Sequence, residues 1–203
     1  MQLKKHLGPL NKENPILVQV LGVCSALAVT AQMKPAVVMG ISVAVVCGFS
    51  NLILSLLRNT IPQRIRIIVQ LVIVAALVIT VDQFLKAYFY DISKTLSVFV
   101  SLIITNCIVM GRIEAFALSH KPIPSFIDGL ANGIGYGLVL LIVSFFRELL
   151  GAGTLWNHQV IPQSFYSNGY LNNGLMVLPP MALIIIGVII WIQRSIHKEL
   201  QEE

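Results

Sequence analysis

The chain has 203 residues, of which 56% are hydrophobic and only 11% are charged. Soluble domains carry about 25% charged residues, so a soluble fold of this composition would expose apolar surface that it has no room to bury. The composition therefore excludes an ordinary soluble domain and favours an all-α, polytopic membrane protein. The net charge of +5 is assigned to the basic flanks of membrane spans, and we expect no binding to nucleic acid.

Six apolar blocks follow one another along the chain and predict six transmembrane helices. A spanning helix needs about 20 residues, with a range of about 17–25. Four blocks have this length, if the third is extended to Ala87, whereas the first and the fourth are shorter. The blocks are Ile16–Ala31, Ala36–Leu57, Ile67–Val81, Leu96–Met110, Phe126–Phe146 and Leu175–Ile192.

The basic residues are distributed unequally between the two sides of the membrane. With six spans both termini lie on one side, and that side receives ten of the 14 lysines and arginines. The positive-inside rule places this side in the cytoplasm, so we expect both termini to be cytoplasmic. The polar start of the chain shows no signal-peptide cleavage site and is expected to be retained.

We expect one membrane domain, residues 1–203, built from two halves at about 1–95 and 96–203. Each half begins with a short apolar block and continues with two longer ones. Three spans per half is an odd number, so the halves must insert in opposite directions, as a 3+3 inverted repeat. Short segments at matching positions of such halves predict half-helices that meet near the midplane and mark the functional site.

Each short block carries one cysteine near its middle, Cys24 in the first half and Cys107 in the second. One interpretation is that both are small packing residues. The alternative is metal ligation, because a thiolate at membrane depth is costly unless a metal ion neutralises it. Two cysteines cannot complete a four-thiolate [2Fe–2S] site, so a second protein chain would have to supply the rest. We expect no disulfide between them, and we interpret Cys47 as a packing residue.

Two acidic residues lie near the ends of predicted spans, Asp82 and Asp128. Carboxylates inside a membrane are costly and are functional hypotheses by default. Hard cations prefer oxygen ligands, so both are candidates for a Na⁺ path. Further oxygen ligands could come from Ser101, Thr105, Asn106 and Asn132. The sequence neighbours Arg112 and Glu114, like Arg147 and its neighbour Glu148, are expected to form local ion pairs.

A glycine stripe, Gly129-x-x-x-Gly133-x-x-x-Gly137, is typical of close packing between membrane helices. We interpret it as a plausible contact surface for another protein chain. No strand precedes it, so a nucleotide-binding loop is rejected.

Long motifs also carry a family resemblance over nearly the whole chain. They include PILVQVLGVCSALAVT at Pro15–Thr30, RIRIIVQLVIVAALVITVD at Arg64–Asp82, LSVFVSLIITNCIVMGRIEAF at Leu96–Phe116, PSFIDGLANGIGYG at Pro124–Gly137 and FFRELLGAG at Phe145–Gly153. The chain resembles the D subunits of the Na⁺-translocating NADH:quinone reductases. The E subunits of the Rnf ferredoxin:NAD⁺ reductases are a cousin family with the same fold.

The resemblance implies a six-helix inverted repeat that pairs with a homologous E-type subunit of opposite topology. It implies that the pair binds one [2Fe–2S] cluster at its interface, with Cys24 and Cys107 as this chain's ligands. The cluster would relay electrons between the flavins of the F and C subunits, in a complex that also contains the A and B subunits and exports Na⁺. NADH, flavins and quinone would belong to the other subunits, in a bacterial inner membrane, and the chain would not be catalytic alone.

Three alternatives stay open at this point. The chain would otherwise be a membrane component of an Rnf-type ferredoxin:NAD⁺ reductase, a stand-alone secondary transporter built on an inverted repeat, or a structural scaffold. A transporter would work alone with both cysteines replaced, whereas a redox component needs them.

Overall fold

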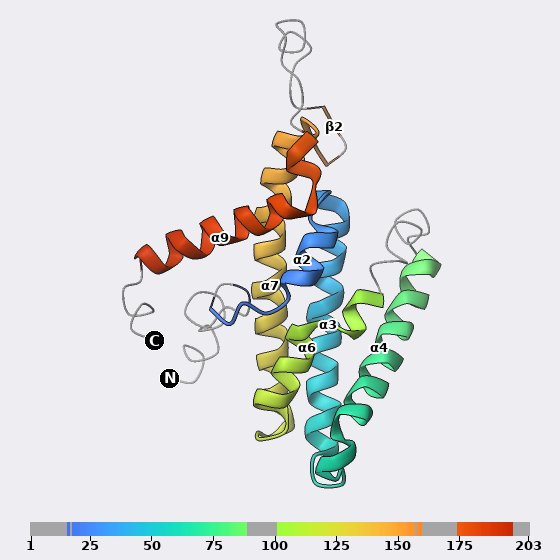
Figure 1. Cartoon of the computed structure of the whole chain (residues 1–203). Helices are drawn as coiled ribbons and strands as arrows, with labels where there is room; N and C mark the ends of the chain where they lie inside the picture. Colours follow the sequence, from blue (N-terminus) through green and yellow to red (C-terminus); the bar gives the residue numbers. More distant parts are fainter. Residues whose placement is uncertain (1–15, 17, 89–100, 157, 160–173, 197–203) are drawn as a thin grey trace, which may run out of the picture.

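The computed structural model describes residues 16, 18–88, 101–156, 158–159 and 174–196, and these are almost entirely helical (Figure 1). The expected cytoplasmic termini lie outside the described residues. The described helices are α2 (Val23–Val29), α3 (Met33–Leu57), η2 (Gln63–Ile65), α4 (Arg66–Tyr88), α6 (Cys107–Arg112), the π-helical η3 (Ile113–Ala117), α7 (Pro122–Gly151), η4 (Gly174–Val177) and α9 (Pro179–Ile196). A two-residue antiparallel pair, β1 (Thr154–Leu155) and β2 (His158–Gln159), follows α7.

Four helices, α3, α4, α7 and α9, are long and apolar enough to cross a membrane. They coincide with the four long apolar blocks, and they confirm an all-α, polytopic membrane protein. The two short blocks contain the short helices α2, of 7 residues, and α6, of 6 residues. At about 1.5 Å per residue neither could cross about 30 Å of hydrocarbon, so both fit the expectation of half-helices.

The centre of the fold is the pair α3 and α7, which run antiparallel and in contact along their length (Figure 1). The glycine stripe of α7 faces α3: a Cβ atom on Gly129 would lie 2.7 Å from the carbonyl oxygen of Cys47, and one on Gly40 would lie 2.9 Å from Cα of Gly137. The stripe is therefore an intramolecular contact, and its interpretation as a surface for another chain was wrong. Cys47 is fully buried in this contact, as its interpretation as a packing residue requires.

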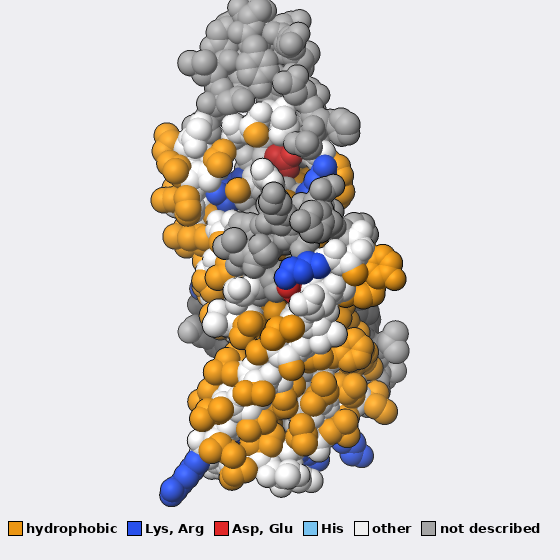
Figure 2. All heavy atoms as spheres, turned by 90° about the vertical axis from the view of Figure 1, so that its right-hand side faces the viewer, with side chains coloured by type: hydrophobic (Ala, Val, Ile, Leu, Met, Phe, Trp, Pro, Cys, Tyr) orange, Lys and Arg blue, Asp and Glu red, His pale blue; other side chains and the backbone are white. Residues whose placement is uncertain are grey.

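Helices α4 and α9 splay away from this central pair (Figure 1). Only 17% of the apolar window of α4 and 11% of that of α9 are buried within the chain. Figure 2 shows the side on which α4 lies, where hydrophobic side chains form a broad surface. Exposed side chains of α4 include Ile67, Ile68, Val72 and Phe84, which suits contact with lipid or with another membrane protein.

The element order within the described residues repeats once: a short helix and two long helices, α2–α3–α4, are followed by α6–α7–α9. The division into halves that insert in opposite directions stays a prediction, and the antiparallel course of α3 and α7 supports it (Figure 1).

Candidate metal centre

The two cysteines of the short segments come together. The sulfur atoms of Cys24 and Cys107 lie 4.0 Å apart, although 83 positions separate the residues in the sequence. Both thiols are free and both are exposed on the surface of the chain. Two sulfurs that each lie about 2.3 Å from a tetrahedral metal ion are about 3.8 Å apart, so the observed spacing fits two ligands of one ion. Within the described residues no group of three or more Cys, His, Asp or Glu surrounds such an ion.

Both sulfurs stand at the beginning of a short helix. Cys24 is the second residue of α2, and Cys107 is the first residue of α6. Each cysteine therefore lies in the first turn of its short helix. The side chain of Asn106 caps α6 by accepting a hydrogen bond of 3.1 Å from the backbone N–H of Ile108.

Gly22 lies where the starts of α2 and α6 meet. It precedes α2 with φ +79°, a left-handed conformation that favours glycine. A Cβ atom at this position would lie 2.6 Å from Cδ1 of Ile108 and 3.2 Å from the ring of Tyr136. The absence of a side chain at Gly22 therefore allows the two cysteine-bearing helices to approach each other.

A buried hydrogen-bond network lies next to both cysteines. Ser25, which follows Cys24, donates its hydroxyl proton to the carbonyl of Gly22 at 3.0 Å. Its oxygen lies 2.6 Å from the hydroxyl of Tyr136 and 3.3 Å from the amide nitrogen of Asn106. Because Ser25 has one proton and uses it on Gly22, Tyr136 and Asn106 are the donors in the other two bonds.

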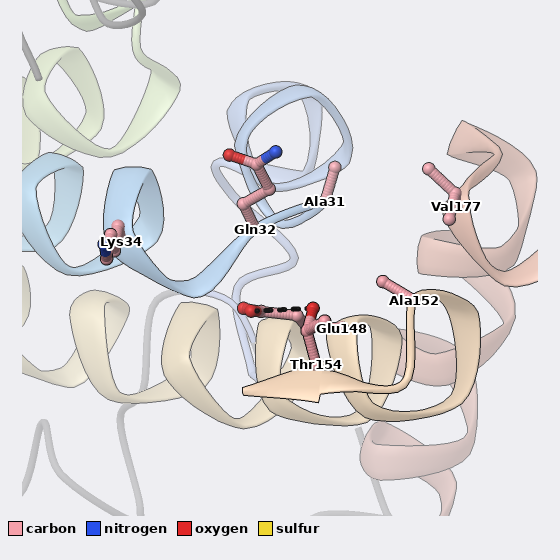
Figure 3. Close-up of a pocket in the computed structure, with 7 residues that line it drawn as sticks. All are labelled: Ala31, Gln32, Lys34, Glu148, Ala152, Thr154 and Val177. Atoms are coloured by element: carbon pink, nitrogen blue, oxygen red, sulfur yellow. Dashed lines mark hydrogen bonds between the residues drawn. The ribbon is translucent and has the colours of Figure 1, made fainter. Parts of the chain in front are cut away.

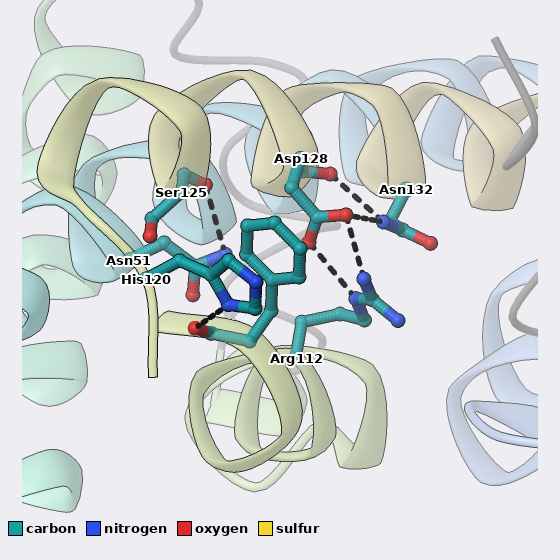
Figure 4. Close-up of polar contacts among 7 residues, drawn as sticks. Asn51, Arg112, His120, Ser125, Asp128 and Asn132 are labelled. Atoms are coloured by element: carbon teal, nitrogen blue, oxygen red, sulfur yellow. Dashed lines mark hydrogen bonds and ion pairs between the residues drawn. The ribbon is translucent and has the colours of Figure 1, made fainter. Parts of the chain in front are cut away.

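Asp128 is buried and paired with Arg112 (Figure 4). The guanidinium donates to the two carboxylate oxygens at 2.6 and 3.0 Å, and the side-chain amide of Asn132 donates to one of them at 3.1 Å. The expected pair of Arg112 with Glu114 is therefore wrong. Glu114 instead accepts hydrogen bonds from Arg66 at 2.9 Å and from Gln70 at 3.0 Å.

Two amide oxygens beside Asp128 have no hydrogen-bond partner in the described part of the chain. They belong to Asn51 on α3 and Asn132 on α7, and both side chains are fully buried. Asn51 donates with its nitrogen to the carbonyl of Ser125 at 3.3 Å.

Asp82 lies on α4 and forms an ion pair with Lys86, one helical turn later. Its side chain is 16% exposed. Among the described residues no contact joins Asp82 to the cysteines or to Asp128, so the structure does not bring the two carboxylates into one site.

A second buried arginine, Arg147, links α2 to the segment before α9. Its side chain is buried, and the guanidinium donates to the carbonyls of Met176 and Val177 at 3.1 and 2.7 Å. It also donates to the hydroxyl of Thr30, at the C-terminal end of α2. The neighbouring Glu148 accepts from the backbone N–H of Met33 at 2.7 Å and from the hydroxyl of Thr154 at 3.5 Å.

Comparison with known proteins identifies the family. The family model described as "Rnf-Nqr subunit, membrane protein" matches residues 3–190. The chain belongs to the Rnf-Nqr family.

Three curated relatives of this Rnf-Nqr protein carry the name of the D subunit of the Na(+)-translocating NADH-quinone reductase. The relative from Shewanella halifaxensis is 56% identical over 202 residues, which are 99% of this chain and 96% of the relative. The relative from Aeromonas hydrophila is 60% identical over 192 residues, covering 95% and 91%. The relative from Photobacterium profundum is 58% identical over 197 residues, covering 97% and 94%. The resemblance to D subunits found in the sequence is thereby confirmed.

An open pocket of about 300 Å³ lies between the start of α3 and the end of α7 in this family member (Figure 3). Its polar lining comes from Gln32, Lys34, Glu148 and Thr154. The carboxylate of Glu148 is held by hydrogen bonds within the chain, and no contact connects this pocket to the cysteine pair in the described residues.

Sequence reasoning missed Ser25 and Tyr136, the two hydroxyls of the network beside the cysteines. It treated Asn106 only as a source of oxygen for a cation, whereas the structure uses this residue as a helix cap and as a donor to Ser25. A polar residue directly adjacent to each cysteine, Ser25 and Asn106, was the signal available in the sequence.

Proposed function

We propose that this chain is the D-type membrane subunit of a Na⁺-translocating NADH-quinone reductase and that Cys24 and Cys107 bind an iron–sulfur centre within it. The observation that carries the proposal is the 4.0 Å separation of the two sulfurs. The names of the relatives, which match this chain over more than nine-tenths of its length, support the assignment to the complex.

The residues present fit one half of a [2Fe–2S] site. Such a cluster is held by four cysteine thiolates, and this chain supplies two of them with the spacing of ligands to one iron. Both sulfurs are exposed, which leaves the opposite side open to thiolates of a second chain. A homologous E-type subunit of opposite topology would provide these two thiolates.

The position of the pair suits a relay across the membrane. When bound, an iron–sulfur centre supplies one-electron redox chemistry. Electrons do not cross about 30 Å of hydrocarbon efficiently in one step, so a site near the midplane divides the distance. Ser25, next to Cys24, contacts Tyr136, and Tyr136 stands at the middle of the 30-residue helix α7.

The chain's own residues hold the two thiolates and exclude water behind them. Gly22 lets the short helices meet, with both sulfurs in the first turn of their helices. Behind them the buried side chains of Ile108, Val109 and Ala26 form an apolar wall. Without water the local dielectric constant is low, which strengthens the electrostatic interaction between the centre and nearby charges.

This chain would act as one subunit of a larger complex in the membrane. NADH oxidation, flavins and quinone reduction belong to the A, B, C and F subunits, while this chain and its E-type partner carry electrons between the flavins of F and C. The complex lies in a bacterial inner membrane, with both termini of this chain in the cytoplasm. The excess of basic residues on one side supports this orientation.

Replacement of either ligand is expected to stop electron transfer through the complex. In membrane vesicles, Cys24→Ser and Cys107→Ser should each lower NADH-driven quinone reduction and Na⁺ export together, by about 100-fold or more, the upper range for disturbing a metal site. Cys47→Ala is the matched control, because Cys47 is buried between α3 and α7, and it should keep most of the activity. Na⁺ transport that survives both cysteine changes would instead indicate a stand-alone transporter.

A Na⁺ path past Asp82 and Asp128 is the second part of the proposed function. The buried network around Asp128 supports it, because the amide oxygens of Asn51 and Asn132, which have no hydrogen-bond partner among the described residues, are the kind of ligand that hard cations prefer. Both carboxylates form ion pairs with basic side chains in this structure, Asp128 with Arg112 and Asp82 with Lys86. A passing cation would compete with these side chains for the carboxylates.

Asp128→Asn and Asp82→Asn should raise the Na⁺ concentration that gives half-maximal turnover. Loss of about 1.4 kcal/mol of carboxylate–cation attraction corresponds to a tenfold increase. Glu114→Gln is the control, since this acidic side chain is half-exposed and pairs with Arg66 at the surface. If turnover depends on Na⁺ in the same way in both Asp variants and in the unmodified complex, neither residue lies on the path.

A further inference from the structure

We propose that Tyr136 is a positioning residue for the cysteine pair: by donating to Ser25, its hydroxyl fixes the separation of the sulfurs of Cys24 and Cys107. The inference rests on the proposed role of the pair as metal ligands. It assigns to Tyr136 no contact with the metal and no part in electron transfer.

A hydrogen-bond network connects Tyr136 to the residues next to both cysteines. Ser25 is adjacent to Cys24, and Asn106 is adjacent to Cys107. Both side chains are fully buried, and the hydroxyl oxygen of Ser25 lies 2.6 Å from Tyr136 and 3.3 Å from Asn106. The network is thus a direct polar link between the two cysteine-bearing segments, beside the contact of the two sulfurs themselves.

The hydroxyl of Ser25 has all its hydrogen-bonding positions filled. Its proton goes to the carbonyl of Gly22, and its oxygen receives protons from Tyr136 and Asn106. Removal of the Tyr136 hydroxyl leaves Ser25 with an empty acceptor position in a place that water does not reach. Ser25 can then rotate toward other partners, and the restraint on Cys24 is lost.

Helix α7 provides a rigid support for Tyr136. The helix is held against α3 on both sides of this residue, where Gly133 and Gly137 approach Ala44 and Gly40 closely. Helix α7 also contacts the far ends of the two short helices, through Asp128 to Arg112 and through Arg147 to Thr30.

Those two contacts fix where the short helices end. By contrast, the bond of Tyr136 to Ser25 lies beside a cysteine, at the start of α2. Groups that orient metal ligands from behind typically change metal affinity by about 10–100-fold when they are removed.

Cadmium binding to the purified full chain tests the proposal without the other subunits. The chain carries Cys47→Ala, so that Cys24 and Cys107 are its only thiols, and Cd²⁺ is titrated while the thiolate-to-metal absorption is recorded. Tyr136→Phe keeps the ring and removes only the hydroxyl. We expect its dissociation constant for Cd²⁺ to rise about tenfold, with the full two-sulfur absorption per bound ion at saturation, because both ligands remain and only their placement is lost.

Ser144→Ala is the matched control. Ser144 is also a fully buried hydroxyl on α7, but it bonds to the carbonyl of Leu141 in its own helix, at 3.1 Å. The dissociation constant of the Ser144→Ala chain for Cd²⁺ should stay within about twofold of the value for the chain with Tyr136 and Ser144 intact, since no positioning contact is removed.

Ser25→Ala tests the same link from the other side and keeps the proposal testable if Tyr136→Phe does not fold. It should weaken Cd²⁺ binding about as much as Tyr136→Phe does, and the double variant should add little, because both remove one network. Unchanged affinity in folded Tyr136→Phe, or in folded Ser25→Ala, would overturn the inference while leaving the metal pair intact. Cd²⁺ absorption that persists in Cys24→Ser at full intensity would overturn the proposed metal site itself.

Discussion

Gly22→Ala is expected to separate α2 from α6 and to release iron from the assembled complex. The new methyl group would lie 2.6 Å from Cδ1 of Ile108, and Gly22 has a φ of +79°. The left-handed conformation costs an alanine about 1–2 kcal/mol, and overpacking of a buried contact costs about 1–3 kcal/mol. Iron per complex and the thermal unfolding midpoint should therefore both fall, since the contact between the starts of the two short helices is part of the fold.

A partial rescue separates the steric effect from the backbone effect. Ile108→Val removes the Cδ1 atom that the new methyl group would meet, so Gly22→Ala should cost less stability in this background. The control is Gly187→Ala on α9, where a Cβ atom would meet no heavy atom within 4 Å. Full iron retention in Gly22→Ala would show that the close contact at Gly22 is not needed to bring the cysteines together.

Asp128→Ala is expected to have the second large effect, on stability. It leaves the buried guanidinium of Arg112 without the carboxylate that it contacts at 2.6 and 3.0 Å. Removing one partner of a buried ion pair typically costs about 3–5 kcal/mol, because the remaining charge is uncompensated. The measurement is thermal unfolding of the purified chain in detergent, with the unmodified chain beside it.

Two further variants show whether the cost comes from the stranded charge. Arg112→Met combined with Asp128→Leu removes both charges and should recover most of the lost stability. Glu114→Gln breaks the pair with Arg66, in which the Glu114 and Arg66 side chains are 54% and 27% exposed, and should cost about 1 kcal/mol or less. An Asp128→Ala chain that is no less stable than Glu114→Gln would contradict the assignment of a buried, tightly coupled pair.

The long helices were predictable because block length and hydropathy are read directly from the sequence. Ala36–Leu57 corresponds to α3 at Met33–Leu57, and Phe126–Phe146 falls inside α7 at Pro122–Gly151. The meeting of Cys24 and Cys107 was expected for another reason: in the predicted inverted repeat, the short segments at matching positions of the two halves meet near the midplane.

The choice of partner for each polar side chain was not predictable in this way. Arg112 was expected to pair with Glu114, although residues two apart on a helix do not face each other. In the structure Arg112 turns toward Asp128 on α7, and Glu114 turns toward Arg66 at the start of α4. Likewise, nothing in the sequence around Arg147 indicates that it donates to the carbonyls of Met176 and Val177, which lie 29 and 30 positions further along the chain.

The packing partner of the glycine stripe was also not predictable from the sequence. Small residues at every fourth position predict a close helix contact, but they do not say which helix makes it. In this chain the partner of Gly133 and Gly137 is α3, through Ala44 and Gly40. Only the three-dimensional arrangement distinguishes this contact from an interface with another chain.

The role of the paired sulfurs is tested most directly by measuring iron in the purified complex with and without Cys24. If Cys24 and Cys107 are iron ligands, the unmodified complex contains iron with a paramagnetic signal on reduction. Cys24→Ala should lose that iron and that signal while this chain still co-purifies with its partners. Equal iron content and an equal signal in the two complexes would contradict the assignment of Cys24 and Cys107 as ligands, and the short distance between their sulfurs would then be a matter of packing alone.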